Sequence, residues 1–384
     1  MKDKLFLVFH GRFPSEKAAA LFVAKSAEAF AEKTCEVILL VPRRFGRASK
    51  PAREFYGLKN NFKIVFLPTI DFFPFPVLRK LAFYISYISF SIITFIYLIL
   101  RAKRHDTIYS NEALPVLLAS FILPKTVYEI HDFPKENFFY RKIFSKVSKF
   151  VVTNVWKSEK LQKIFSVSRD RIIAEQNAVS LLDFKTTLST LEARSTLKLS
   201  IDATIITYVG SLRTMGMEKG IEVALEALLL LPEKVKLLLV GGSPEDVLFY
   251  SKKAKQLEII NRVIFTGFVP HEKVPLYLSA SDVLIAPFPK NDHYEFYMSP
   301  MKIFEYMASG RPIVASNLQS IREILLGDSA VFVLPGNVKS LAEGVVGLLD
   351  NGDEASIKIA NAMKVVQNHS WEGRAKRILD FILH

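Results

Sequence analysis

The stretch SPMKIFEYMASGRPIVAS at residues 299–316 contains one acid, Glu305, among mostly apolar side chains. On its own the pattern favours an ion pair between Glu305 and Lys302, which lies one helical turn earlier. A carboxylate in this setting could instead accept hydrogen bonds from the paired hydroxyls of a ribose. Backbone amides at the start of the helix, from about Met301 onward, would attract a phosphate.

The boundaries of this helix are encoded locally. Ser299 is a favoured N-cap and Pro300 suits the first helical position, where a backbone N–H would be unused. Gly310 can adopt the left-handed conformation that ends a helix, and Pro312 cannot continue it. A short buried strand is predicted at 312–316.

A second candidate loop, GSLRTMGMEKG, spans residues 210–220. Its glycines, beginning with Gly210, allow a close backbone approach, and Arg213 and Lys219 could neutralise a diphosphate. A solvated basic loop is the simpler reading, but Lys219 directly before a predicted helix favours phosphate binding. The loop matches neither the Walker A spacing nor G-x-G-x-x-G, which weakens ATPase and dehydrogenase assignments.

The length of the chain predicts its number of domains, and the distribution of charge indicates which kinds of partner it could bind. The 384 residues predict two domains, and the net charge of +13 is uneven: residues 1–176 carry 29 Lys/Arg and 15 Asp/Glu. This basic half suits nucleic acid or an anionic membrane surface, but no nucleic-acid-binding motif is present, so we expect no nucleic acid partner. The single cysteine, Cys35, excludes an intramolecular disulfide and is expected to be a core residue.

The run LAFYISYISFSIITFIYLIL at residues 81–100 is uncharged and flanked by basic residues on both sides within 79–104. Its length is that of a transmembrane helix. The segments around it read as strands of one sheet, however, which favours a helix that covers the sheet with one face and lies in a membrane interface with the other. A fully buried helix is the alternative. The amino terminus does not resemble a secretory signal.

Short apolar strands alternate with helical patterns along the whole chain, which predicts parallel sheets covered on both faces. We expect an α/β fold of two doubly wound, Rossmann-like domains, residues 1–175 with 370–384 and residues 176–369. Ligands in such sheets bind beyond the carboxyl ends of the strands, here in a cleft between the domains. The predicted strands are 4–10, 36–42, 62–68, 107–110, 125–132, 149–154, 204–212, 236–242, 262–269, 282–289, 312–316 and 330–335.

Taken together, the motifs resemble a GT-B glycosyltransferase of family 4, the retaining class that uses nucleotide sugars. In the C-terminal half the resemblance lies in YVGSL, EKGIEVALEAL, LLLVGG, VIFTGFVPHEKVPLYLSASDVLIAPF, SPMKIFEYMASGRPIVAS and SWEGRAKRIL. In the N-terminal half it lies in FPSEKAAALFVAKSAEAFAE, YEIHD at 128–132 and QNAVSLLDF. The pieces span nearly the whole chain in the expected order.

The resemblance implies a role for each candidate residue. Glu305 would bind the donor ribose, Lys219 the diphosphate, and the backbone near Phe268 and Val269 the base. His131 would face the donor sugar across the cleft, although a histidine satisfied at a helix start is the plainer reading. The remaining implied contacts to the donor are Gly11, Arg12, Ser15, Gly210, Ser211, Ser299, Pro300, Met301 and Lys302. The closing helix would return to the N-terminal domain.

Two positions depart from the family pattern. The first glutamate of the E-x7-E motif is replaced by Tyr297, with Glu295 two residues away. The arginine that many members carry in the first loop of the C-terminal domain is replaced by Ser211, for which Arg213 could substitute. These changes affect how the sugar hydroxyls and the phosphates would be recognised.

The predicted reaction is sugar transfer from a UDP- or GDP-sugar with retention of the anomeric configuration. Arg213, Lys219 and the helix amides would stabilise charge on the leaving diphosphate, whose phosphate would take the acceptor proton. We expect no cofactor and no metal. A saccharide or lipid-linked acceptor, and a location at the inner face of the plasma membrane, follow from the basic half and the apolar helix.

Three other functions compete with this reading. A nucleotide-sugar 2-epimerase shares the two-domain architecture but needs further acids in the cleft. A catalytically silent GT-B module at a membrane would fit Tyr297. A nucleic-acid binder has only the charge in its favour.

Overall fold

The computed structural model describes residues 3–33, 36–45, 50–71, 79–185, 188–214 and 216–383, so Cys35 lies outside the described residues. The chain forms two compact units. Unit 1 comprises Met1–Gln176 and Trp371–His384, and unit 2 comprises Asn177–Ser370. The C-terminal helix therefore belongs to the same unit as the N-terminal half of the chain.

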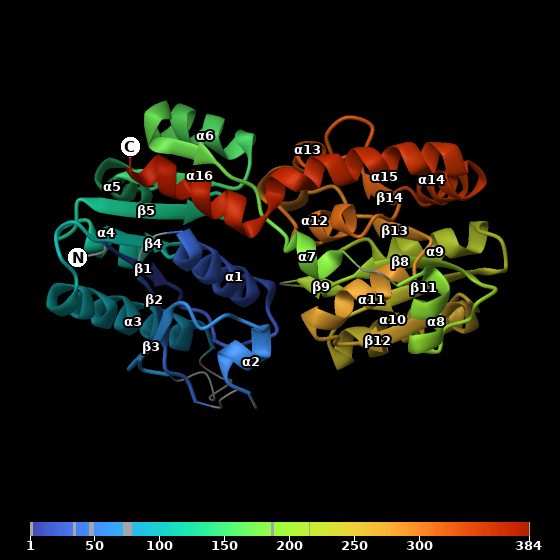
Figure 1. The fold of residues 1–384 in the computed structure, drawn as a ribbon, viewed down its shortest axis with the longest axis horizontal. Helices are drawn as coiled ribbons and strands as arrows, with labels where there is room; N and C mark the ends of the chain where they lie inside the picture. The colour runs from blue at the N-terminus through green and yellow to red at the C-terminus, as the bar shows by residue number, and fades with distance from the viewer. Residues whose placement is uncertain are drawn as a thin grey trace. The chain divides into compact units, whose positions relative to one another are not determined.

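Unit 1 is built on a parallel sheet with the strand order β3-β2-β1-β4-β5-β6-β7 (Figure 1). The strands are β1 (Lys4–Val8), β2 (Glu36–Pro42), β3 (Lys63–Leu67), β4 (Thr107–Ser110), β5 (Lys125–Ile130), β6 (Lys149–Val152) and β7 (Ile172–Ala174). The helices are α1 (Ala18–Lys33), α2 (Ala52–Tyr56), α3 (Arg79–Arg101), α4 (Ala113–Ala119), α5 (Phe138–Lys146), α6 (Val155–Phe165) and α16 (Trp371–Leu383). Six strands confirm the sequence predictions, and β7 was not predicted.

Helices cover both faces of this sheet because the strand side chains alternate in direction. Phe6 and Val8 of β1 point to the face where Phe90 of α3 packs. On the other face, the ring of Tyr109 lies 5.3 Å from that of Phe30 in α1. Helix α16 packs beside α1 on this second face (Figure 1).

Helix α3 is apolar on both its inner and its outer face. Its inner face is buried on the sheet, whereas only 28% of its most apolar window is buried, so a fully buried helix is excluded. The outward side chains recur every three or four residues and are each about half exposed or more: Leu81, Tyr84, Ile88, Ile92, Ile96 and Ile99. By length and composition, Lys80–Arg101 is also the one candidate membrane span among the described residues.

Unit 2 contains a second parallel sheet, with the order β12-β11-β8-β13-β14-β15, and a small antiparallel hairpin of β9 and β10. Its strands are β8 (Thr204–Val209), β9 (Arg213–Thr214), β10 (Met217–Glu218), β11 (Val235–Val240), β12 (Val263–Gly267), β13 (Val283–Ala286), β14 (Ile313–Ser316) and β15 (Val331–Val333). Its helices are α7 (Leu181–Phe184), α8 (Thr190–Leu197), α9 (Ile221–Leu230), α10 (Pro244–Gln256), α11 (Val274–Ser279), α12 (Met301–Ala308), α13 (Gln319–Arg322), α14 (Val338–Asp350) and α15 (Gly352–Val366).

The two parallel sheets confirm the predicted α/β, Rossmann-like architecture. All six strands predicted for the second half are present, and Gly310 adopts the left-handed conformation expected after α12, with φ of +67°. The loop at 210–220 differs from its prediction because it contains the hairpin of β9 and β10. The loops after β8, β12 and β13 leave the same edge of the sheet, where a ligand would bind.

Candidate functional site

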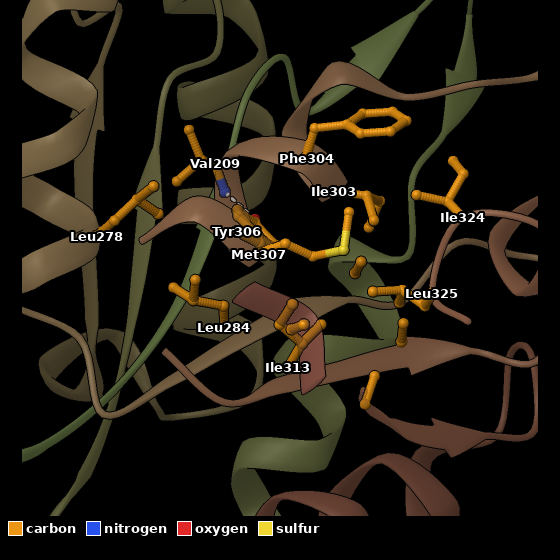
Figure 2. Close-up of a cluster of buried hydrophobic side chains, with 14 of the residues drawn as sticks. Val209, Leu278, Leu284, Ile303, Phe304, Tyr306, Met307, Ile313, Ile324 and Leu325 are labelled. Carbon is orange, nitrogen blue, oxygen red and sulfur yellow. Dashed lines mark hydrogen bonds between the residues drawn. The ribbon is translucent and has the colours of Figure 1, made fainter. Parts of the chain in front are cut away.

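Helix α12 is held rigidly against the sheet of unit 2. Four of its eight residues are fully buried, and they pack against Leu284 of β13 and Ile313 of β14, among others (Figure 2). The Tyr306 hydroxyl accepts a hydrogen bond of 2.8 Å from the Val209 backbone N–H, which Figure 2 shows as a dashed line. Because Val209 ends β8, this bond fixes the second half of α12 against the end of β8.

Lys302, in the first turn of α12, is half-buried, and its buried ammonium group has no acceptor among the described residues. Its Nζ lies 3.5 Å from the ring centroid of Tyr208 and 5.3 Å from that of Phe288. Among the described residues, Nζ has no hydrogen-bond partner. Burial lowers the pKa of Lys302 well below its ordinary value, and the nearby charge of Lys219 lowers it further, although Glu305 raises it. The predicted ion pair with Glu305 is not the arrangement observed.

Two glycines allow this close packing. Gly210 has φ of +119°, and a Cβ on it would lie 3.3 Å from Lys302 Nζ. Gly220 has φ of +85°, and a Cβ there would lie 1.7 Å from the Pro287 carbonyl oxygen. Gly220 thus brings the end of the hairpin against the segment after β13, with Lys219 directly before it.

Lys219 supplies a second positive charge to this region. Its Nζ donates a hydrogen bond of 2.9 Å to the Ser211 hydroxyl, and the side chain is half-buried. Burial lowers the pKa of Lys219 to about 8, although Asp246 opposes the shift. Desolvating ammonium groups is costly unless an anion compensates them. Lys219, Lys302 and the N-terminus of α12 therefore form a site suited to an anion, which we call the two-lysine site.

Arg213 does not join the two-lysine site in this structure. Its Nε donates to Asp246 at 2.7 Å, and its guanidinium lies 4.6 Å from the ring centroid of Phe249. Both partners belong to α10. The second cation beside Lys219 is therefore Lys302, which the sequence also predicted as a donor contact, and the contact predicted for Arg213 stays a prediction.

Glu305 is 7% exposed and is paired with a residue that the sequence reading did not single out. Its Oε1 lies 2.9 Å from Nε2 of His271, which belongs to the short helical turn His271–Lys273 after β12. No donor among the described residues reaches its other oxygen. His271 follows Phe268 and Val269, the predicted base contacts, and Phe268 is 48% exposed. The motif VPHEKVP is the sequence feature that could have drawn attention to His271, although it gives no sign of the distant Glu305.

The segment before α12 is anchored differently from its prediction. Pro300, not Ser299, occupies the N-cap position, and no side chain caps the helix. The Ser299 hydroxyl instead accepts a hydrogen bond of 3.1 Å from the Asn177 backbone N–H, which ties the segment to the start of unit 2. Glu295 lies in the π-helical turn His293–Tyr297, and its Oε1 accepts a bond of 3.4 Å from the Gln319 N–H. Glu295 therefore faces α13.

The predicted residues of unit 1 lie at the carboxyl edge of its sheet. His131 directly follows β5, and Gly11, Arg12 and Ser15 follow β1. Arg12 donates to the Phe45 carbonyl at 3.1 Å, and the Ser15 backbone is bonded to Tyr56 of α2. Their expected contacts with a donor stay predictions. In the described part of the chain, no three His, Cys, Asp or Glu side chains gather as metal ligands would.

One sequence family matches part of the chain. Residues 203–351 match the family "Glycosyl transferases group 1", so the match covers the sheet of unit 2 and the two-lysine site.

Curated relatives resemble part of the chain. An uncharacterized glycosyltransferase of Methanocaldococcus jannaschii is 27% identical over 228 residues, 58% of this chain and 56% of the relative. The D-inositol 3-phosphate glycosyltransferase of Xylanimonas cellulosilytica is 27% identical over 233 residues, covering 58% and 54%. The Escherichia coli O-antigen chain mannosyltransferase B is 29% identical over 171 residues, covering 43% and 42%. The chain thus spans about half the length of the curated relatives it matches.

Solved structures resemble the whole chain. Sucrose-phosphate synthase from Thermosynechococcus elongatus superposes with a TM-score of 0.80 at 18% identity, covering 99% of this chain and 98% of that one. Anabaena HepE, solved in complex with UDP-glucose, has a TM-score of 0.74 at 17% identity and covers 99% of each chain. At these identities the likeness establishes the fold, which is GT-B.

Proposed function

From the glycosyltransferase group 1 domain at residues 203–351, we propose that this protein transfers a sugar from a nucleoside diphosphate to a saccharide or lipid-linked acceptor. The two-lysine site is the observation that carries the proposal. Lys302 Nζ is buried without an acceptor, and Lys219 adds a second charge beside it. A diphosphate would supply the missing negative charge and the missing hydrogen-bond acceptors at once.

The neighbouring residues suit the rest of such a donor. Glu305 is one turn along α12 from Lys302, so its carboxylate would accept hydrogen bonds from the ribose hydroxyls, with His271 orienting it. The loop with Phe268 and Val269 would receive the base. Support for this class of ligand also comes from HepE, a structural neighbour whose structures contain UDP and UDP-glucose.

In the proposed reaction, the two-lysine site stabilises the leaving group. As the bond between the anomeric carbon and the phosphate oxygen breaks, negative charge grows on the diphosphate, and Lys219, Lys302 and the amides of α12 would stabilise it. In the retaining route that we propose, the departing phosphate oxygen takes the proton of the acceptor hydroxyl. That hydroxyl then forms the new bond on the face that the diphosphate leaves. The route needs no metal.

Donor binding is tested by thermal unfolding with UDP, GDP and their sugars. We expect one nucleotide series to raise the unfolding temperature of the wild-type protein, and the variant Lys302→Met to lose this shift. Lys358→Met is the matched control, because Lys358 is a buried lysine of unit 2 that contacts the carboxylates of Asp328 and Glu354. No shift with any nucleotide at millimolar concentration would refute the proposed donor class.

The reaction itself is tested by analysing products by NMR. Incubation with the donor and candidate acceptors should give a glycoside with the anomeric configuration of the donor. Conversion of the donor sugar without any acceptor would identify an epimerase instead. Binding of the donor without turnover for any acceptor, together with unchanged function of a Glu305→Ala variant in cells, would identify a silent module.

Helix α3 supports a further part of the proposal, contact with the inner face of the plasma membrane. Its outward side chains form an apolar stripe along the whole helix, and Lys80, Arg101, Lys103 and Arg104 flank its ends. Apolar side chains that enter an interface, with basic residues beside anionic headgroups, are typical of peripheral membrane proteins. Such contact would bring a lipid-linked acceptor to unit 1.

Sedimentation with vesicles tests this contact. We expect binding to vesicles that contain phosphatidylglycerol and weaker binding to neutral ones. Ile92→Glu with Ile96→Glu, on the exposed face of α3, should abolish sedimentation. Leu230→Glu, at a similarly exposed apolar position on α9 of unit 2, is the control. Equal sedimentation of both variants would rule out α3 as the contact surface.

A further inference from the structure

His131 is held at the carboxyl edge of the unit 1 sheet with its two ring nitrogens in different surroundings. The ring packs edge-on against Phe22 of α1, with centroids 4.9 Å apart. Its Nε2 is buried, has no hydrogen-bond partner among the described residues, and lies 3.4 Å from Oε1 of Glu129. The side chain as a whole is 32% exposed, and of its two ring nitrogens only Nε2 is both buried and unpaired.

Glu129 is placed to act on this ring. It precedes His131 by two residues at the end of β5, and side chains two apart on a strand share a face. It is 1% exposed and accepts a hydrogen bond of 2.7 Å from the Tyr109 hydroxyl. Its Oε1 also pairs with the guanidinium of Arg374 from α16.

Arg374 keeps the buried carboxylate charged. Burial is the largest single influence and would raise the pKa of Glu129, but the charge of Arg374, together with His131 and the Tyr109 hydroxyl, outweighs it and brings the pKa to about 2. Arg374 is itself 2% exposed, donates from Nε to the Gln176 carbonyl at 2.8 Å, and lies over the ring of Phe22. The C-terminal helix therefore supplies the positive charge, Arg374, that pairs with Glu129 on the sheet of unit 1.

The backbone of His131 is fixed as firmly as its side chain. Lys157 of α6, which is fully buried, donates to the carbonyl oxygen of His131 and, at 2.6 Å, to the Thr153 hydroxyl. A charged donor on the first carbonyl after the strand opposes movement of the loop that follows. The backbone at His131 is therefore held in one position, and the imidazole ring stays beside Glu129.

We propose that Glu129, held ionised by Arg374, positions His131 as the Nε2-protonated tautomer, so that Nδ1 is offered as an acceptor to a hydroxyl of a bound sugar. A carboxylate beside one ring nitrogen stabilises a proton on that nitrogen, and the neutral ring then has its lone pair on the other. Glu129 and Arg374 are positioning residues in this scheme, and His131 is the group that touches substrate.

The tautomer does not depend on the proposed function, whereas the identity of the ligand as a sugar does. The first test is therefore spectroscopic and needs no ligand. Two-bond ¹H–¹⁵N spectra of the seven histidines, with His131 assigned by its absence from a His131→Gln variant, should show an Nε2 proton near neutral pH. In Glu129→Gln the amide can donate to Nε2, and the proton should move to Nδ1.

Two further variants distinguish a change of tautomer from a general loss of folded structure. Glu129→Gln leaves Arg374 buried without a negative partner, so Glu129→Gln with Arg374→Gln removes both charges and should show the same change of tautomer. Arg377→Gln is the matched control. Arg377 also joins α16 to unit 1, through bonds of 2.7 and 2.9 Å to Glu175, without contacting His131.

Activity provides the second readout. With an active donor and acceptor, Glu129→Gln should lower kcat on the order of tenfold or more with little change in donor KM, and Arg377→Gln should leave kcat within about twofold. An Nδ1-protonated ring in the wild-type protein, or an unchanged tautomer in Glu129→Gln, would overturn the proposal even if the enzyme is active. An inactive wild-type protein with the expected tautomers would refute the function alone.

Discussion

Oε1 of Glu305 lies 2.9 Å from Nε2 of His271, which joins the middle of helix α12 to the loop after β12. The contact occupies one carboxylate oxygen and leaves the other without a donor among the described residues. It also fixes the direction of an acid that is 7% exposed in an apolar setting. A carboxylate that is oriented in this way is preorganised to accept hydrogen bonds from ribose hydroxyls, so it does not have to move when the donor binds.

Replacing Glu305 should separate recognition of the nucleoside from recognition of the phosphates. We expect Glu305→Ala to weaken binding of the nucleoside diphosphate about 10- to 100-fold, because charge-assisted hydrogen bonds to the ribose are lost. Inorganic pyrophosphate should bind as it does to the wild-type protein. The measurement is titration calorimetry with each ligand.

Two other variants complete this comparison. Lys302→Met should weaken both ligands, since it acts on the phosphates. Glu272→Ala, at the exposed neighbour of His271, should weaken neither. A parallel loss of nucleotide and pyrophosphate in Glu305→Ala would contradict the ribose assignment.

Lys302→Met should also stabilise the protein while it impairs binding. A buried ammonium without an acceptor opposes folding, and methionine fills a similar volume beside Tyr208 and Phe288. We expect the free energy of unfolding to rise by about 1 kcal/mol or more in urea titrations without ligand. Lys358→Met should not raise it, because Lys358 contacts two carboxylates. A clear loss of stability in Lys302→Met would mean that the charge is compensated.

The architecture could be predicted from the sequence because a strand that is buried on both faces of its sheet consists almost entirely of apolar residues. Segments 36–42 and 204–212 show this pattern. Strand β7 was missed because its three residues, Ile172–Ala174, follow the charged turn Arg169–Arg171 and give too short an apolar run. The hairpin of β9 and β10 was missed because its strands have two residues each and no alternating pattern.

The site could be predicted only in outline. Glu305 and Lys302 are three apart on one helix, so the sequence favours their pairing. The structure instead places Lys302 over Tyr208 of β8 and Glu305 beside His271. Both partners come from distant segments that tertiary packing brings together. Arg213 illustrates the same limit, since Asp246 of α10 already matches its charge.

Donor affinity should fall as the pH rises through about 8. Burial lowers the pKa of Lys219 to about 8 in the unliganded protein, so its charge is lost above that value, while a bound diphosphate favours the charged form. Binding above pH 8 should therefore take up a proton, which calorimetry in two buffers of different ionisation enthalpy measures. The diphosphate of a nucleotide sugar keeps a constant charge near pH 8, because both of its phosphates are esterified, so it does not contribute to this proton uptake.

The lowered pKa of Lys219 has the opposite effect on the stability of the unliganded protein, which should rise with pH where donor affinity falls. Between about pH 8 and the ordinary lysine pKa, the unfolded chain binds more protons at this position than the folded one. Lys219 therefore contributes a rise in stability with pH over this window. Lys219→Arg should bind the donor with no loss of affinity near pH 8, since arginine stays charged. A pH-independent affinity in the wild-type protein would show that Lys219 does not bear on the phosphates.

The position of α12 should depend on the Tyr306 hydroxyl. It accepts from the buried Val209 N–H at 2.8 Å and donates to the Ile285 carbonyl at 3.3 Å, so Tyr306→Phe leaves two buried backbone groups unsatisfied. We expect a loss of about 1–3 kcal/mol in the free energy of unfolding and weaker donor binding, because the second half of α12, which carries Glu305, is no longer tied to the end of β8.

Tyr250→Phe distinguishes this effect from the general cost of removing a buried hydroxyl. The Tyr250 hydroxyl is also buried in unit 2 but has no hydrogen-bond partner among the residues that the structure describes. Its removal should leave stability unchanged or raise it, and donor binding should stay as in the wild-type protein. Equal losses in the two variants would show that the bond to Val209 does not hold α12, and that the rigidity of the two-lysine site comes from apolar packing alone.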